Sequence, residues 1–148
     1  MSLSYLQPID ESFTLDDYKP QQVGFQLQKH LPSLGLPDLK DVKIAFFCIE
    51  TMGQSFYRFR QHLYTLFMGN WNFGIADLGN LPLGATEEDT HFAIKEIVAD
   101  LIKEGVIPIV LGGSQDFTYS LYRAFDSLEQ MVNLVSVDAK FDFGNEEE

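Results

Sequence analysis

Short apolar runs that do not alternate with polar residues limit the folds available to this chain more than any other feature. Four strand-length candidates of this kind occur, at residues 43–49, 73–79, 106–111 and 131–137. Strands without alternation are buried on both faces of a sheet, so helices must cover both sides. Between these runs, apolar residues recur at the spacing of amphipathic helices. The alternation of strands and helices along the chain predicts an α/β fold with a three-layer, doubly wound parallel sheet.

The helical patterns between the strands cover residues 55–67, about 86–104 and 116–130. Thr86 and Asp89 resemble a capping box at the start of the second helix, and Gly105 is a plausible stop. The residues expected to face the core in the first helix are Phe56, Phe59, Leu63, Leu66 and Phe67. Those expected in the second are Ile94, Ile97, Val98, Leu101 and Ile102. Those expected in the third are Leu121, Tyr122, Phe125 and Leu128.

Residues 1–42 differ from the rest, because they mix Pro, Asp and Gln without sustained periodicity. We therefore predict an irregular N-terminal extension over residues 1–42 and an α/β domain over residues 43–148.

Charge and composition exclude several classes of partner. The chain of 148 residues has 22 acidic and 10 basic residues and a formal charge of −12, which disfavours nucleic acid and anionic membranes. No apolar run is long enough to span a membrane, and residues 1–20 lack a secretory pattern. Cys48, the one cysteine, cannot form an internal disulfide and reads as a buried apolar residue. We predict a cytoplasmic protein without nucleic-acid or membrane partners.

Ligand sites in doubly wound sheets lie beyond the carboxyl ends of the strands. The turn after the third strand reads "GGSQD", which has neither the dinucleotide-binding spacing nor the Walker spacing. Its paired glycines permit close backbone approach, and the following helix N-terminus could attract an anion. Alternatively, Asp116 or Ser114 simply caps that helix. The candidate ligand-binding residues of this turn are Gly112, Gly113, Ser114, Gln115 and Asp116.

A second polar stretch, "VDAKFD", follows the fourth predicted strand. Asp138, Lys140 and Asp142 alternate there, so their side chains could project together. Two carboxylates could hold a divalent metal, although a protonated lysine is a poor ligand. A salt-bridged cluster is an equally good interpretation. The three histidines, His30, His62 and His91, sit apart from both stretches and do not support a zinc site.

Taken together, the two stretches resemble motifs of the ureohydrolase family, which contains arginases, agmatinases and formimidoylglutamases. That family has G-G-D-H-S-x-T after one strand and D-A-H-x-D after the next, where this chain reads "GGSQDFT" and "DAKFD". The segment "IADLGNLPLG" is also similar to the family's preceding strand. The resemblance covers roughly residues 43–144 and is closest to a divergent bacterial, formimidoylglutamase-like branch.

The resemblance implies hydrolysis of C–N bonds in linear amidines, such as formimidoylglutamate, agmatine or arginine, by a pair of manganese ions in a homo-oligomer. Asp138 and Asp142 match two metal ligands, but Gln115 and Lys140 stand where the family has ligating histidines. Ser114 and Asp116 likewise replace the first motif's Asp and Ser. We therefore expect no manganese to be bound by this chain, with Asp138 and Asp142 as vestigial metal positions. Lys140 becomes a candidate ligand-binding residue that supplies positive charge in place of the metal.

The family's sheet continues beyond the fourth strand, so we expect this chain to be an N-terminal piece with an incomplete second half. The first hypothesis is a ureohydrolase-like domain that is inactive alone. The alternative is a non-catalytic domain that binds a ligand or a partner subunit, and a third is an anion-binding module that uses residues 112–116.

Overall fold

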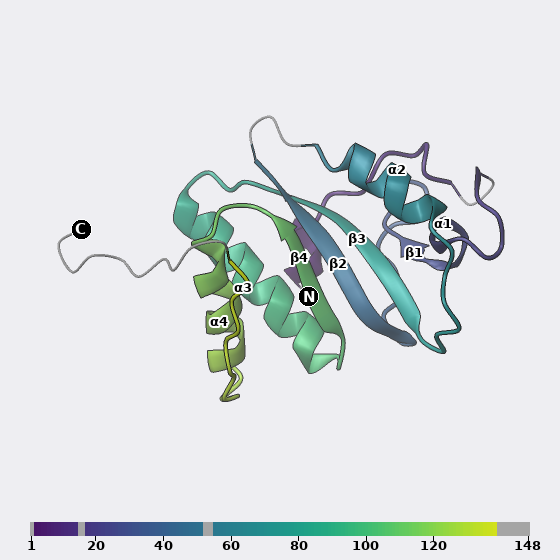
Figure 1. Cartoon of the computed structure of the whole chain (residues 1–148). Coiled ribbons are helices and arrows are strands. Elements are labelled where there is room, and N and C mark those ends of the chain that lie inside the picture. Colours follow the sequence, from purple (N-terminus) through teal and green to yellow (C-terminus); the bar gives the residue numbers. More distant parts are fainter. Residues whose placement is uncertain (1, 15–16, 52–54, 139–148) are drawn as a thin grey trace.

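A parallel four-stranded sheet forms the centre of the molecule (Figure 1). The computed structural model describes residues 2–14, 17–51 and 55–138. The strands lie in the order β1-β3-β2-β4, and each neighbouring pair is parallel. Their bounds are Gln28–Lys29 for β1, Val42–Glu50 for β2, Gly74–Pro82 for β3 and Ile107–Gly112 for β4.

Helices cover both faces of this sheet, as the unbroken apolar strands predict. On one face, α3 (Glu87–Lys103) and the short 3-10 helix η1 (Ser2–Tyr5) pack onto the strands, with α4 (Phe117–Asp126) beside α3 (Figure 1). On the other face lie α2 (Tyr57–Thr65) and α1 (Val23–Gln26). The predicted three-layer α/β architecture is confirmed.

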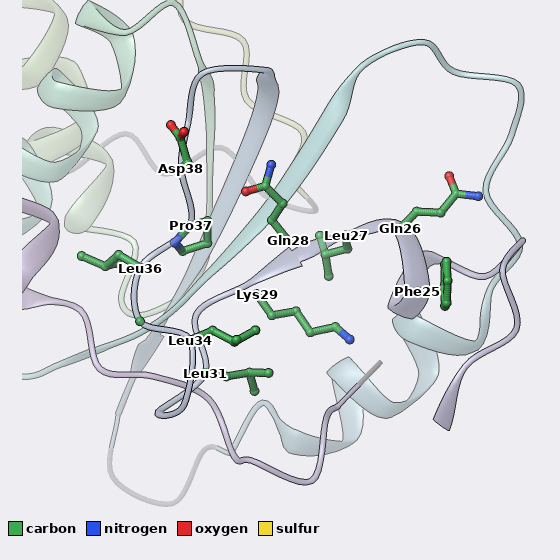
Figure 2. A pocket seen from close by; sticks show the side chains of 11 residues that line it. Phe25, Gln26, Leu27, Gln28, Lys29, Leu31, Leu34, Leu36, Pro37 and Asp38 are labelled. Atoms are coloured by element: carbon green, nitrogen blue, oxygen red, sulfur yellow. The ribbon is translucent and has the colours of Figure 1, made fainter. Parts of the chain in front are cut away.

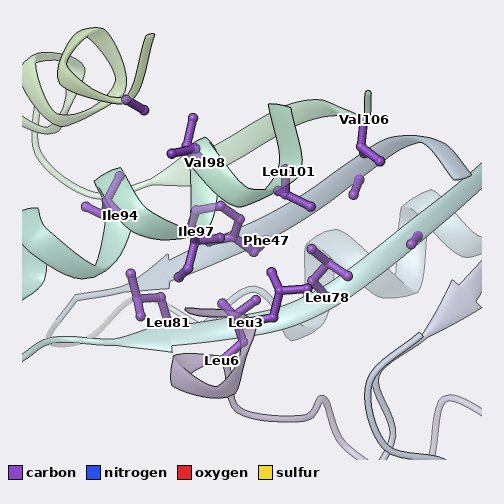
Figure 3. Packing of buried hydrophobic residues seen from close by; sticks show 14 of the residues in the cluster. Leu3, Leu6, Phe47, Leu78, Leu81, Ile94, Ile97, Val98, Leu101 and Val106 are labelled. Atoms are coloured by element: carbon purple, nitrogen blue, oxygen red, sulfur yellow. The ribbon is translucent and has the colours of Figure 1, made fainter. Parts of the chain in front are cut away.

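The larger core lies between α3 and the sheet (Figure 3). Ile94, Ile97 and Leu101 are fully buried there against Phe47 and Leu78. This helix begins where the sequence predicts. The Asp89 N–H donates to Thr86 Oγ1 and the Thr86 N–H donates to Asp89 Oδ2, both at 3.1 Å. The capping box is thus confirmed, and Gly105, at φ +73°, follows the helix end.

The fourth predicted strand is wrong for this structure. Residues 131–137 form no strand, and Met131, Leu134 and Val137 are 101%, 77% and 99% exposed. Within the described ranges β4 therefore ends the sheet, and its side chains alternate between exposed and partly buried. An apolar run shows that a segment gains free energy by burial, but burial also needs a surface to pack against. Here the run does not pair with β4.

The inward faces of two helices also differ from the prediction. In α2, Leu63 packs against the core as predicted and the buried residues are Arg60 and Tyr64. Phe59 in this helix and Leu66 and Phe67 just beyond it are exposed. The sheet beneath α2 presents the buried carboxylate of Asp77, which only polar partners can satisfy. In and just after α4, Leu121 and Leu128 pack against the core as predicted, but Tyr122 is half exposed, and the buried residues are Phe117, Ser120 and Ala124.

The N-terminal segment packs into both cores despite its lack of periodicity. Leu3 and Leu6 contact the α3 side of the sheet, while Phe13 and Leu27 join the cluster beneath α2. The main-chain groups of Gln7 and Asn80 exchange two hydrogen bonds, at 2.7 and 2.9 Å. The proposed division of the chain at residue 42 stays a prediction. None of the helices in the described ranges is long and apolar enough to cross a membrane.

Candidate functional site

An open pocket lies at the carboxyl ends of β2, β3 and β4, where the fold class places ligand sites. Its volume is about 580 Å³. The wall is built from Thr51 after β2, the β3–α3 loop with Thr86 and Glu87, and the turn after β4 with Ser114 and Asp116. The parallel register brings these segments together, because Ile49 pairs with Gly112 and Glu50 with Pro82.

The two glycines of the turn have a conformational role. Gly112 and Gly113 have φ values of +78° and +84°, in the left-handed region that side chains disfavour. A Cβ on Gly112 would lie 2.3 Å from the Phe56 ring, and one on Gly113 would lie 2.4 Å from the Phe117 ring. The turn can therefore approach its surroundings this closely only with glycine at both positions.

The fold brings the two sequence motifs into contact at one point. Gln115 Nε2 lies 3.3 Å from Asp138 Oδ2, a long hydrogen bond between two exposed side chains. These residues stand where the ureohydrolase resemblance places the first ligating histidine and an aspartate. Lys140 and Asp142, the other two predicted site residues of the second motif, lie outside the described residues.

Asp116 does not cap helix α4 with its side chain, contrary to one alternative from the sequence. Its carboxylate Oδ2 lies instead 3.2 Å from His91 Nε2, on helix α3. A hydrogen bond from Ser114 and the proximity of His91 lower the pKa of Asp116. The other ring nitrogen of His91, Nδ1, is 2.5 Å from Ser120 Oγ.

His91 is thus part of a polar cluster next to the turn, and the expectation that it sits apart from the predicted site is wrong. The sequence gives little signal of this contact, because His91 and Ser120 lie on different helices, 29 residues apart. The packing of α3 against α4 brings them together.

A second polar group that the sequence did not indicate lies under α2. The Asp77 carboxylate is fully buried and accepts hydrogen bonds from Arg60 Nε at 2.6 Å, Arg60 Nη2 at 3.0 Å and the Tyr64 hydroxyl at 2.5 Å. Burial opposes the charge of Arg60, but the bonds and charge of Asp77 outweigh it and raise the guanidinium pKa. Burial and the Asp77 charge likewise raise the pKa of Tyr64.

This group extends to the carboxyl end of the sheet through Asn80. Arg60 Nη1 donates to Asn80 Oδ1 at 2.8 Å, and Asn80 Nδ2 donates to Glu50 Oε1 at 2.8 Å. Since a guanidinium can only donate, the Asn80 oxygen must face Arg60 and its amino group must face Glu50. The network therefore fixes the orientation of Glu50 at the end of β2.

A smaller pocket of about 390 Å³ lies beside β1, away from the strand ends (Figure 2). Leucines and Pro37 dominate its lining, and none of the predicted site residues contributes to it. Lys29 runs along it, and its Nζ donates to the Phe13 carbonyl at 3.0 Å. Burial lowers the pKa of Lys29 to about 8. Cys48 lies inside β2, where burial raises its pKa to about 12, as expected for an inert thiol.

The fold and the pocket define an α/β protein with its site at the carboxyl edge of a parallel sheet. Residues 50–148 match the model of the Arginase family, so the chain belongs to that family.

Two relatives match part of the chain. The chain is 36% identical over 72 residues to the "Uncharacterized 32.2 kDa protein in hmfB 3'region" of Methanothermus fervidus, covering 48% of this chain and 25% of that protein. It is 35% identical over 66 residues to the mitochondrial guanidino acid hydrolase of Mus musculus, covering 44% of this chain and 18% of that enzyme. The matched region thus spans a quarter or less of each relative.

Arginase-family proteins generally use manganese, but the described residues do not fit a manganese pair. Among residues 2–14, 17–51 and 55–138, no three His, Cys, Asp or Glu side chains are placed to hold one ion. At the matching position, Gln115 offers an amide whose amino group faces Asp138. Hard cations need several oxygen ligands, which one amide and one carboxylate do not supply.

Proposed function

We propose that this protein is a ureohydrolase-like member of the arginase family that acts on the C–N bonds of linear amidines, and that this chain does not catalyse by itself. The formimidoylglutamase-like branch, with formimidoylglutamate, agmatine or arginine as candidate substrates, is the more specific part of the proposal. Membership of the family and similarity to a guanidino acid hydrolase support the general part of the proposal, a ureohydrolase-like protein.

One contact supports the proposal that this chain does not catalyse by itself. Gln115 Nε2 lies 3.3 Å from Asp138 Oδ2, so an amide faces the carboxylate where the resemblance puts an imidazole ligand. A donor aimed at this carboxylate competes with a cation for the same lone pairs. Water ionises near neutral pH only when a metal lowers its pKa, so a site without the metal lacks the nucleophile of this chemistry.

The alternative function is non-catalytic binding through the same cleft. Amidinium and guanidinium groups are planar cations, and carboxylates bind them through paired, charge-assisted hydrogen bonds. Asp116 and Glu87 line the carboxyl-edge pocket, and the net charge of −12 favours the approach of cationic ligands. We further propose that the protein is homo-oligomeric, as the resemblance implies, and cytoplasmic, in keeping with its one cysteine.

The experiment measures turnover and binding separately. The chain is loaded with manganese and given formimidoylglutamate, agmatine and arginine in turn, while formamide, ammonia and urea are quantified. Calorimetry with agmatine tests binding on the same samples. The proposal expects no turnover above the protein-free rate. Agmatine binding without turnover favours the non-catalytic alternative, and manganese-dependent turnover by this chain alone contradicts the claim of inactivity.

A restored variant sharpens this test. Gln115→His combined with Lys140→His returns the two imidazoles that the resemblance places in the metal site. We expect this variant to bind manganese at least ten-fold more tightly than the parent. Gln61→His, at an exposed position of α2, adds a histidine elsewhere and is the matched control. Equal affinity in all three proteins would contradict the assignment of positions 115 and 140.

A further inference from the structure

A separate pocket of about 430 Å³ lies between helices α3 and α4, and nothing in the proposed hydrolase chemistry uses it. Phe92 and Tyr119, which are 54% and 60% exposed, form aromatic walls. His91 and Ser120 also line this pocket, and Ser120 is its most enclosed member at 2% exposure. The volume lies within the usual range for small-molecule sites.

The hydrogen bonds at this pocket have a defined direction. Asp116 is a carboxylate and can only accept, so the proton of a neutral His91 lies on Nε2, 3.2 Å from Asp116 Oδ2. Nδ1 then carries a lone pair, and the Ser120 hydroxyl, 2.5 Å away, must donate to it. The result is a serine hydroxyl bonded to a base that a carboxylate orients, which is the arrangement that activates a nucleophile.

Two cations extend the same side of each helix. Lys95 follows His91 by one turn of α3, and Arg123 follows Ser120 by one turn of α4. Both line the pocket. Arg123 Nη1 donates to the Tyr119 hydroxyl at 3.1 Å, which holds the guanidinium beside the aromatic wall. Glu88 lines the same pocket, and Lys95 Nζ pairs with Glu96 at 3.0 Å. A cation beside the pocket favours the negative oxygen that develops when a carbonyl is attacked.

We propose that Ser120, His91 and Asp116 form an acyl-transfer site for small carboxylic esters, which opens between α3 and α4 and shares Asp116 with the carboxyl-edge pocket. Ser120 Oγ forms a bond to the ester carbonyl carbon while its proton passes to His91 Nδ1. The C–O bond to the alcohol breaks, and the alcohol leaves with the proton from Nδ1. Water then attacks the acyl-serine and gives one proton to Nδ1. The serine ester bond breaks, the carboxylic acid departs, and the proton returns to Ser120 Oγ.

The competing explanation is that His91 only connects α3 to α4. A purely structural connection predicts that its loss lowers the melting temperature and changes no reactivity. The acyl-transfer site predicts covalent chemistry at one serine, so the two are distinguished by a chemical readout.

The test treats the whole chain with diisopropyl fluorophosphate in EDTA, which removes any contribution from a metal. Ser120 Oγ forms a bond to phosphorus, the P–F bond breaks, fluoride leaves, and the proton goes to His91. Peptide mass spectrometry locates the adduct. We expect modification of Ser120 in the parent and none at that peptide in Ser120→Ala. Ser127→Ala is the matched control, because Ser127 Oγ donates to the Ala124 carbonyl at 2.7 Å and has no imidazole partner. It should be modified at Ser120 like the parent.

The roles of His91 as the base and Asp116 as its orienting carboxylate are tested by the rate of labelling. His91→Gln should slow labelling about 100-fold or more, since general-base catalysis typically contributes that much. Asp116→Asn, which permits the wrong tautomer, should slow labelling at least ten-fold with little change in melting temperature. The same ranking should appear in hydrolysis of p-nitrophenyl acetate.

If His91→Gln does not fold, the pH dependence of labelling in the parent protein still tests whether His91 acts as the base. Its labelling rate should rise with pH through the range in which an imidazole loses its proton. A rate that only follows hydroxide concentration overturns the proposal. So does an unlabelled parent, or labelling that persists in Ser120→Ala.

Discussion

Replacing Arg60 with methionine should lower the free energy of unfolding by about 3–5 kcal/mol, because it leaves a buried carboxylate without its cation. Asp77 is fully buried and Arg60 is 2% exposed, so water cannot replace the lost partner. The Tyr64 hydroxyl and the Gly79 N–H, at 2.5 and 2.9 Å, would still donate to Asp77, but neither carries a positive charge. Asn80 Oδ1 would lose its donor as well.

The loss is large beside the stability of a typical domain, which is about 5–15 kcal/mol. Urea unfolding followed by circular dichroism measures it directly. For a chain of this size, the melting temperature should fall by roughly 6–20 °C. Arg123→Met is the matched control, because Arg123 and Asp126 form an exposed pair at 4.0 Å, whose loss should change stability little.

A double-mutant cycle separates the ion pair from simple loss of packing. Arg60→Met with Asp77→Leu removes both charges, so the combined loss should be smaller than the sum of the single losses by about 2 kcal/mol or more. If Arg60→Met unfolds within 1 kcal/mol of the parent, or if the two losses simply add, the reasoning about this buried pair is refuted.

Three further outcomes follow from other parts of the structure. Burial lowers the pKa of Lys29 from 10.5 to about 8. The unfolded chain therefore binds more protons between these pH values, so stability should rise with pH there by at most about 1.4 kcal/mol per unit, and Lys29→Met should remove the rise. Gly112→Ala should lower the free energy of unfolding by at least about 2 kcal/mol, because the positive φ and the contact with Phe56 both oppose a side chain there. Gly105 has φ +73° but no atom within 4 Å of an added Cβ, so Gly105→Ala should show only the conformational cost of about 1–2 kcal/mol. Equal costs for the two glycine variants would show that the Phe56 contact is relieved without penalty. After manganese loading and gel filtration, elemental analysis should find less than one tightly held ion per chain, and two ions per chain would overturn the ligand argument.

Much of the fold was predictable because local patterns and long-range packing agree. The unbroken apolar runs of β2 and β4 occupy central or partly covered positions, and the Thr86–Asp89 capping box sets the start of α3. Residues 131–137 have the same kind of pattern but no partner strand in this structure, so the pattern alone could not decide their conformation. For the site, the sequence predicted the tight glycine turn, whose two glycines have positive φ values, whereas the Gln115–Asp138 contact is seen only in the structure.

The polar clusters could not be predicted, because a side chain's burial depends on what it meets. An arginine in an amphipathic helix is expected to face solvent, yet Arg60 in α2 is buried because β3 places Asp77 beneath it. His91 reads as an isolated histidine, yet the α3–α4 packing sets it between Asp116 and Ser120.

By itself, the sequence determined the α/β class, the parallel sheet, the limits of the long helix and the family resemblance. These depend on hydrophobic periodicity, capping and turn chemistry, which act between residues close in the chain. The tertiary structure alone decided which polar side chains are buried, which helices carry them inward and which distant residues are joined by hydrogen bonds. Those outcomes depend on the requirement that each buried charge or hydrogen-bonding group find a partner, and the partners come from other elements of the fold.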